Sequence, residues 1–236
     1  MTPTTDTLTP AALYRLQTWL SSSFPTGAFA FSHGLEYAVE AGAVGDAEQL
    51  TEWLSGIVRF GAGRVDAALF RAAWHATADR DDDALAEIAE RADALRGSIE
   101  LALESSAQGQ AYLDGLIKVW PHPRLVGWQT ALHEAGRMPA YAIAVAVAAA
   151  LAEIPLRPAL VAYLNAFAAN LVSATVRLVP LGQTDGQRAM AALEPTILGA
   201  VEAALEREPD DFGSAALIVD WTSMHHETQY TRLFRS

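Results

Sequence analysis

The hydrophobic positions of this chain recur at the spacing of α-helices. Leu13, Leu16 and Leu20 share one helical face, and Thr9 and Pro10 before them supply a capping side chain and a first-turn proline. No run of alternating Val, Ile, Thr or Tyr is long enough for a strand. The pattern therefore predicts an all-α, single-domain bundle without significant β-sheet, of roughly eight to eleven helices at an average length of about 11–12 residues.

Polar residues, glycines and prolines mark the expected helix ends. Asp46 begins a capping-box-like motif for a helix that runs to about Phe60, and Gly42 fits the residue that ends the helix before it. The acidic run at 81–83 favours another helix N-terminus. We find no internal repeat and no clear linker, so we expect one domain over residues 1–236. Prolines are expected to interrupt the chain at Pro121, Pro123, Pro155, Pro158, Pro180 and Pro195.

Two uncharged apolar segments, 140–152 and 159–176, raise the question of a membrane span. The first is shorter than the about 20 residues that a spanning helix needs. The second carries Asn165 and Asn170, whose polar groups are costly in lipid. We therefore expect two buried core helices. Small residues in the second suit a close helix–helix contact, either within the monomer or at a dimer interface: Ala162, Ala166 and Ala169.

Composition narrows the function classes. The chain has 51% hydrophobic residues and a formal net charge of −12, which argues against a nucleic-acid surface and against an anionic membrane face. It has no cysteine, which excludes a disulfide framework, a thiolate metal site and a cysteine nucleophile. Residues 1–10 contain no basic cluster and no apolar stretch of the kind found in a signal peptide, so we expect a cytoplasmic location.

Common catalytic motifs do not fit this chain. The stretch from Gly182 to Arg188 has the wrong spacing for a phosphate-binding loop, with Asp185 where an anion would lie. Ser32 is preceded two residues earlier by Ala30 instead of glycine, so the nucleophile-elbow pattern fails. We expect no nucleotide or acyl hydrolysis by the chain itself.

The six histidines are scattered, apart from the run His225-His226-Glu227. Neighbouring residues of a helix point about 100° apart, so this run favours hydrogen bonding over metal binding. The alternative is a metal-dependent hydrolase that uses the run, which predicts hydrolytic activity abolished by chelators.

Three segments have an unusual composition. Segment 24–36 has a Pro/Gly turn followed by phenylalanines, which fits either an aromatic plug or an exposed aromatic ridge. Segment 173–188 is a polar, glycine-containing loop. The C-terminal tail, 226–236, is aromatic and cationic on an acidic chain, and Tyr, Phe and Arg are the residue types that anchor protein interfaces.

These three segments together resemble the urease accessory protein UreF family. Segment 24–36 is similar to the family's N-terminal signature Pro-x-Gly-x-Phe-x-x-Ser-x-Gly-Leu-Glu. Residues 177–187 resemble its central loop, and 226–236 resemble its C-terminal end. The three follow in the family's order and span nearly the whole chain. The chain departs from the family pattern at Ile99, where an arginine is expected before the glutamate.

The resemblance implies a dimeric, cytoplasmic, all-α protein without catalytic activity, resident cofactor or metal site of its own. Such a protein acts as a chaperone and scaffold in nickel insertion during urease maturation. It binds the accessory protein UreD/UreH, and together they recruit or regulate the GTPase UreG and deliver nickel to apo-urease. We hypothesise that nickel cation binding here is transient.

The resemblance also implies partner-binding residues, of which the tail, 226–236, supplies most. Arg177 is a candidate ion-pair partner for a nearby carboxylate, and Gln183, Asp185 and Gly186 are expected to shape a loop beneath the tail. We expect deletion of residues 230–236 to leave the melting temperature nearly unchanged. The predicted partner-binding set is Phe29, Ser32, Glu36, Arg177, Gln183, Asp185, Gly186, His226, Glu227, Gln229, Tyr230, Arg232, Leu233, Phe234, Arg235 and Ser236.

Overall fold

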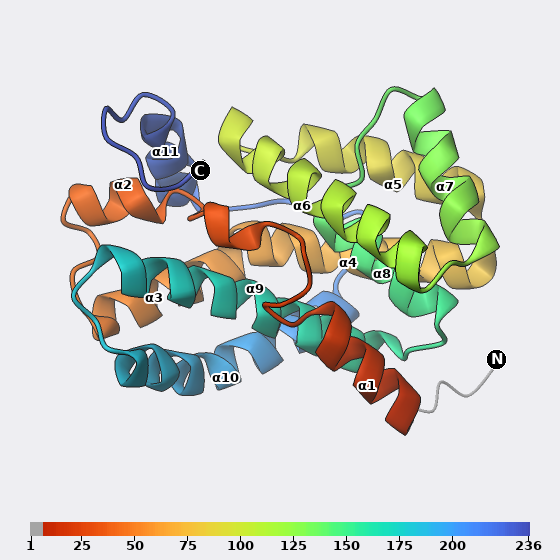
Figure 1. Cartoon of the computed structure of the whole chain (residues 1–236), viewed down its shortest axis with the longest axis horizontal. Helices are drawn as coiled ribbons and strands as arrows, with labels where there is room; N and C mark the ends of the chain where they lie inside the picture. The colour runs from red at the N-terminus through yellow and green to blue at the C-terminus, as the bar shows by residue number, and fades with distance from the viewer. Residues whose placement is uncertain (1–6) are drawn as a thin grey trace.

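The computed structural model describes residues 7–236, and over these residues the chain is all-α and contains no strand, as predicted (Figure 1). The number of helices lies within the predicted range. In chain order the elements are α1 (Pro10–Trp19), the 3₁₀ turn η1 (Ala28–Ala30), α2 (Leu35–Glu40), α3 (Ala47–Phe60), α4 (Ala62–Asp79), α5 (Asp82–Ala94), α6 (Ile99–Val119), α7 (Pro123–Glu134), α8 (Tyr141–Leu151), α9 (Leu156–Leu178), α10 (Gln183–Glu206) and α11 (Leu217–His226).

The helices begin where capping side chains allow. The side chains of Thr9, Asp46 and Asp81 each accept a hydrogen bond, of 2.9–3.1 Å, from the backbone N–H three residues ahead. These bonds satisfy donors that a helix N-terminus leaves free, so they fix the starts of α1, α3 and α5. Gly42, with φ of 75°, follows α2 in the left-handed conformation predicted for it.

Helices α4 and α8 form the centre of the molecule (Figure 1). Helix α8 is apolar all round and is buried continuously over residues 142–149, as expected of a helix surrounded by others. Helix α4 also contacts α3, α5, α9 and α10, and α8 contacts α6, α7 and α9. One hydrophobic cluster joins these elements, with Phe70, Tyr112 and Tyr163 among its largest side chains.

Helix α9 is the only helix among the described residues that is long and apolar enough to cross a membrane by length and composition. Of its most apolar window, 56% is buried inside the fold, where α9 packs against α4, α8 and α10. A core helix of this kind passes the same composition test. The segment is therefore a core helix, as predicted.

Two of the predicted proline breaks are wrong. Pro158 lies in the first turn of α9, where a missing N–H removes no intrahelical bond. Pro195 lies inside α10, which continues on both sides of it. Packing of one α10 face into the core holds the helix together through the proline, with Leu193, Ile197 and Val201 buried.

The polar loop predicted over segment 173–188 is shorter than expected, because α9 continues to Leu178 and α10 already begins at Gln183. A Cβ added at Gly186 would lie 3.2 Å from the side chains of Val172 and Val176. The glycine therefore lets the first turn of α10 approach α9 closely. Asp185 caps this turn by accepting a hydrogen bond of 3.2 Å from the N–H of Gly182.

Candidate docking site around the anchored C-terminal tail

Residues 227–236 of the tail follow α11 and fold back onto the segment around η1, so that the C-terminus lies beside α2 (Figure 1). The N–H of Ser32 donates to the carbonyl of Ser236 at 2.9 Å, and the N–H of Arg235 donates to the carbonyl of Ala30 at 2.8 Å. The hydroxyl of Ser32 also donates to the Ser236 carbonyl. Two of the three unusual sequence segments are therefore hydrogen-bonded to each other.

The third segment reaches the same place through Arg177 at the end of α9. Its Nη1 donates to the carbonyl of Phe29 at 2.8 Å, and its guanidinium lies 4.4 Å from the ring centroid of Phe234. No carboxylate of a described residue pairs with Arg177, so the structure does not contain the predicted ion pair within residues 7–236. The guanidinium instead joins η1 to the tail by a hydrogen bond and a cation–π contact.

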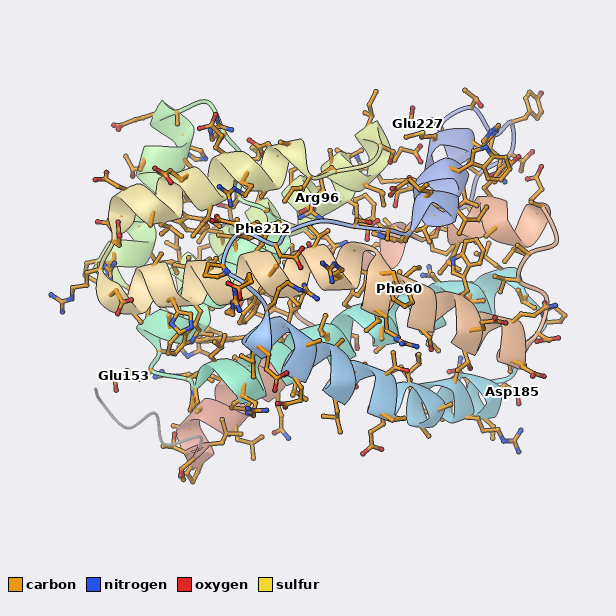
Figure 2. The ribbon with its side chains drawn as sticks, turned by 180° about the vertical axis from the view of Figure 1, so that it is seen from behind. Phe60, Arg96, Glu153, Asp185, Phe212 and Glu227 are labelled. Carbon is orange, nitrogen blue, oxygen red and sulfur yellow. The ribbon has the colours of Figure 1, made fainter. Side chains whose placement is uncertain are left out.

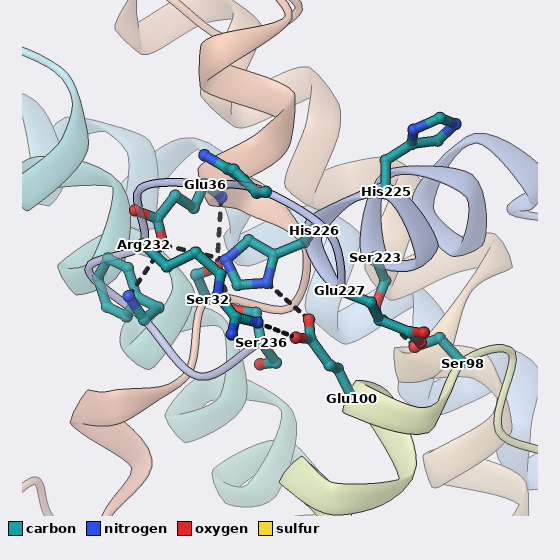
Figure 3. Close-up of polar contacts among 12 residues, drawn as sticks. Ser32, Glu36, Ser98, Glu100, Ser223, His225, His226, Glu227, Arg232 and Ser236 are labelled. Carbon is teal, nitrogen blue, oxygen red and sulfur yellow. Dashed lines mark hydrogen bonds and ion pairs between the residues drawn. The ribbon is translucent and has the colours of Figure 1, made fainter.

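Glu36, in the first turn of α2, holds the tail backbone. Its Oε1 accepts a hydrogen bond from the N–H of Leu233 at 2.6 Å, and its Oε2 accepts one from the N–H of Phe234 at 2.9 Å. Oε2 also lies 3.0 Å from Nε2 of His226 (Figure 3). The carboxylate is buried and has three hydrogen-bond donors from the end of the chain.

Glu100, which is labelled in Figure 3, and Glu104 lie one turn apart on α6 and hold the other side of the tail. Glu100 Oε2 lies 2.6 Å from Nδ1 of His226, and its Oε1 accepts from Arg232 at 2.9 Å. Glu104 Oε2 accepts from the hydroxyl of Ser236 at 2.9 Å and lies 3.3 Å from Nδ1 of His33.

Glu36, Glu100 and Glu104 therefore each accept from, or lie beside, a group of the tail or of the end of α11. His226 is fully buried between Glu36 and Glu100, and each of its ring nitrogens lies within hydrogen-bond distance of one of the two carboxylates. Buried charges are stable only when they are paired and hydrogen-bonded. The tail and the carboxylates consequently stabilise one another.

A close approach of α11 to α2 and α6 makes this arrangement possible. Gly34 has φ of 75°, and a Cβ there would lie 2.8 Å from the backbone N of Ser223. The hydroxyl of Ser98 caps α6 and is 2.6 Å from the hydroxyl of Ser223. Glu227 accepts a hydrogen bond of 3.0 Å from the N–H of Ile99, so α11 is fixed at both helices.

A second buried ion pair lies beneath the N-terminus of α6. Arg96, which precedes α6, donates to Asp66 on α4 at 3.0 Å, and the hydroxyl of Tyr163 donates to the same carboxylate at 2.7 Å. Burial, reinforced by the nearby charge of Asp66, raises the pKa of Tyr163 well above its usual value. The phenol thus remains a hydrogen-bond donor, and the start of α6 is fixed on α4.

The predicted partner-binding residues divide by exposure. Tyr230 is fully exposed, Phe29 is 72% exposed and Leu233 is 63% exposed. Arg232 and Arg235 are also exposed, while Glu227 and Gln229 are half-buried, with Gln229 donating to Glu40. The members whose side chains are buried within the chain are Ser32, Glu36, His226, Phe234 and Ser236.

The structure does not bring the α10 residues to the tail. Gln183, Asp185 and Gly186 occupy the first turn of α10, and in Figure 2 Asp185 lies at the lower edge of the molecule while Glu227 lies near its upper edge. They therefore form a helical turn where a loop was predicted. Gly186 serves helix packing instead, as described above.

Sequence reasoning missed the outer face of α11. This helix buries its polar side chains, among them Thr222, Ser223 and His226, and turns apolar side chains outward. The signal was present as apolar residues at i, i+1, i+4 and i+7. These exposed residues are Leu217, Ile218, Trp221 and Met224.

An aromatic cluster and Ile99 extend this face. His225 stacks on Tyr37 with ring centroids 5.1 Å apart and contacts Trp221 at 4.3 Å. Ile99, the departure from the family pattern, is 77% exposed beside Glu227. We call the exposed residues of α11 together with Phe29, Ile99, Tyr230 and Leu233 the tail face. Exposed apolar surface of this kind marks sites of protein contact.

The His-His-Glu run does not form a metal site in this structure. His225 points away from His226, as the helical spacing predicted (Figure 3), and both ring nitrogens of His226 face carboxylates. No group of three or more His, Cys, Asp or Glu side chains in residues 7–236 is arranged to hold a metal ion.

The fold and the tail face define an all-α protein with a surface suited to protein contact. The family model described as UreF matches residues 44–194. The chain is 47% identical over 226 residues to "Urease accessory protein UreF" of Rhodopseudomonas palustris (strain BisA53), which covers 96% of this chain and 94% of the relative. A protein of the same name from Granulibacter bethesdensis is also 47% identical, over 96% of this chain and 94% of its own length.

A third relative of that name, from Bradyrhizobium diazoefficiens, is 44% identical over 96% of this chain and 92% of its own length. The chain belongs to the UreF family of urease accessory proteins. The resemblance seen in the three sequence segments is thereby confirmed.

The buried contacts of the tail change the expected effect of its deletion. Removing residues 230–236 takes away the hydrogen-bond donors of Arg232, Phe234 and Ser236, so that three buried carboxylates each lose at least one partner. We now predict a loss of about 3–5 kcal/mol in the free energy of unfolding. The melting temperature should fall by roughly 6–20 °C, at about 2–4 °C per kcal/mol for a chain of this size.

Urea and thermal unfolding followed by circular dichroism would measure this loss. Tyr230→Ala is the control, because its side chain is fully exposed and should shift the unfolding free energy by less than about 0.5 kcal/mol. A truncated chain that melts together with the control would show that the tail does not stabilise the fold.

Proposed function

We propose that this protein is a non-catalytic scaffold in nickel insertion into apo-urease. In this role it binds the accessory protein UreD/UreH and, with it, recruits or regulates the GTPase UreG during urease maturation. The proposal rests on family membership and on one observation: a fixed apolar surface, the tail face, that the described residues of the chain leave uncovered.

The anchored tail suits a docking surface. Tyr230 and Leu233 project from a backbone that Glu36 holds in place, so a partner meets them in a fixed arrangement. Fixing side chains before binding lowers the entropic cost of association. Buried residues of the predicted set, such as Phe234, then contribute to partner binding indirectly, because they fix the positions of the exposed side chains.

The contacts made by the polar groups of this site support a chaperone role without enzymatic activity. His226, Glu36 and Glu100 are all engaged in holding the tail, so they are not free to activate a water molecule. The alternative of a metal-dependent hydrolase is therefore not favoured. In our proposal nickel is cargo that contacts this protein transiently while the partners transfer it.

We further propose that the protein works as a homodimer in the cytoplasm. An apolar groove of about 620 Å³ lies between α1 and α9, and a second copy would cover it. Leu13 is exposed at its edge, and Ala162 and Ala166, the small residues noted in the sequence, line it. The burial of α9 in the core supports the soluble location.

Charges placed on the outer face of α11 should prevent partner capture. Leu217 and Met224 lie two turns apart on this face and are exposed, so the double variant Leu217→Asp/Met224→Asp should fold normally. We predict that it retains at most about one tenth of the wild-type affinity for UreD/UreH, a loss of at least about 1.4 kcal/mol. Pull-down with purified UreD/UreH, and nickel-dependent activation of apo-urease, would measure the effect.

Leu198→Asp is the matched control, since Leu198 is an exposed leucine on α10 outside the tail face. If the double variant captures UreD/UreH as well as this control does, the tail face is not the docking site.

The dimer proposal predicts that Leu13→Asp converts a dimer into a folded monomer. A charge in an apolar interface costs its desolvation, whereas on the monomer surface it is hydrated. Light scattering after size-exclusion chromatography would give the mass of wild type, Leu13→Asp and the Leu198→Asp control. A monomeric wild type, or a dimeric Leu13→Asp variant, would contradict the proposal.

A further inference from the structure

A groove along α10 carries a charge opposite to that of the whole protein. It has a volume of about 530 Å³ and lies between the end of α3, the start of α4 and one face of α10. Three arginines and no acidic residue line it, although the chain has 28 acidic and 16 basic residues. The lining residues are Val58, Arg59, Phe60, Arg64, Pro195, Thr196, Gly199, Ala200, Ala203 and Arg207.

The three arginines of the groove have a single carboxylate between them in the ion pairs of the described residues. Arg64 pairs through Nη2 with both oxygens of Asp211, at 2.6 and 2.7 Å. Nε of Arg207 lies 3.5 Å from the same carboxylate, so one negative charge serves two guanidinium groups. The guanidinium of Arg59 lies 4.9 Å from the ring centroid of Phe60 and pairs with no acidic residue among those described.

The pKa of Arg207 agrees with this imbalance. Burial, followed by the charges of Arg64 and Arg71, lowers the pKa of this guanidinium, and Asp211 only partly opposes them. Arg71 is itself bound to main-chain carbonyl oxygens at the end of α10, at 2.8 Å from Ala204 and 2.5 Å from Arg207. An added anion would relieve the repulsion among these arginines.

The shape of the groove favours an extended ligand over a single small ion. From Pro195 to Ala203 the α10 wall extends about 12 Å, at about 1.5 Å per residue. Phe60 is half-exposed at the groove (Figure 2), where it offers an apolar contact between the cationic groups. A Cβ added at Gly199 would meet no atom within 4 Å, so the wall is open to an incoming chain.

We infer that this groove binds an acidic segment of a partner protein, with one side-chain carboxylate on Arg59 and further carboxylates near Arg64 and Arg207, which share only Asp211. Arginine suits this role because its planar fork binds carboxylates through two hydrogen bonds. None of the lining residues belongs to the tail face, so this inference stands or falls separately from the proposed function.

Titration of the full chain with hexaglutamate at low salt, followed by calorimetry, tests the inference. The net charge of −12 repels an acidic peptide, so measurable binding must come from a local positive site. Arg59→Gln should weaken binding about tenfold, since it removes one charge-assisted pair. Arg188→Gln, an equal change of charge outside the groove, should bind as wild type does.

Gly199→Glu tests the same inference with a variant that is expected to remain folded. The new carboxylate has open space and lies among the arginines, so it should occupy the place of the ligand. We expect a higher melting temperature, because glutamate is also the better helix former, and no hexaglutamate binding.

Three results would overturn the inference. The first is no binding of hexaglutamate to the wild type, and the second is equal weakening by Arg59→Gln and Arg188→Gln. The third is pyrophosphate or citrate binding as tightly as hexaglutamate, which would indicate a site for a small oxyanion.

Discussion

The positions of the C-terminal tail and of α11 depend on the buried carboxylate of Glu36. A charged group inside a protein is stable only if other groups replace the water that it loses. Here the replacements are two backbone N–H groups of the tail, at Leu233 and Phe234, and the imidazole of His226. Glu100 on α6 binds the same imidazole from the other side. Helices α2, α6 and α11 and the tail are therefore joined through one histidine.

This arrangement explains why α11 has its polar side inward. The carboxylates of α2 and α6 require polar partners, and α11 supplies His226 to them, while Ser223 on the same face meets the hydroxyl of Ser98. Its apolar side chains are left to face outward, where the described chain offers nothing to cover them. The polar interior and the exposed apolar surface are thus two consequences of one orientation of the helix. A surface of fixed shape follows from it, which suits the scaffold role that we propose.

Much of the fold could be predicted from local signals. The caps at Thr9, Asp46 and Asp81 and the apolar periodicity fix most helices, because both depend on residues close in sequence. The break predicted at Pro195 is wrong, because packing of α10 against residues distant in sequence keeps the helix continuous through the proline. The tail was recognised as unusual, but its partners Glu36 and Glu100 lie more than a hundred residues away in sequence. Which face of α11 is buried depends on those distant carboxylates, so spacing alone does not reveal it.

The central claim is that the tail is anchored in the isolated protein by Glu36. Amide hydrogen exchange at Leu233 and Phe234, measured by NMR on the free chain, tests it most directly, because both N–H groups donate to that carboxylate. Strong protection in the wild type, lost selectively at these two amides in Glu36→Gln, is the predicted result. Exchange at the rate of an unstructured peptide in the wild type would contradict the account.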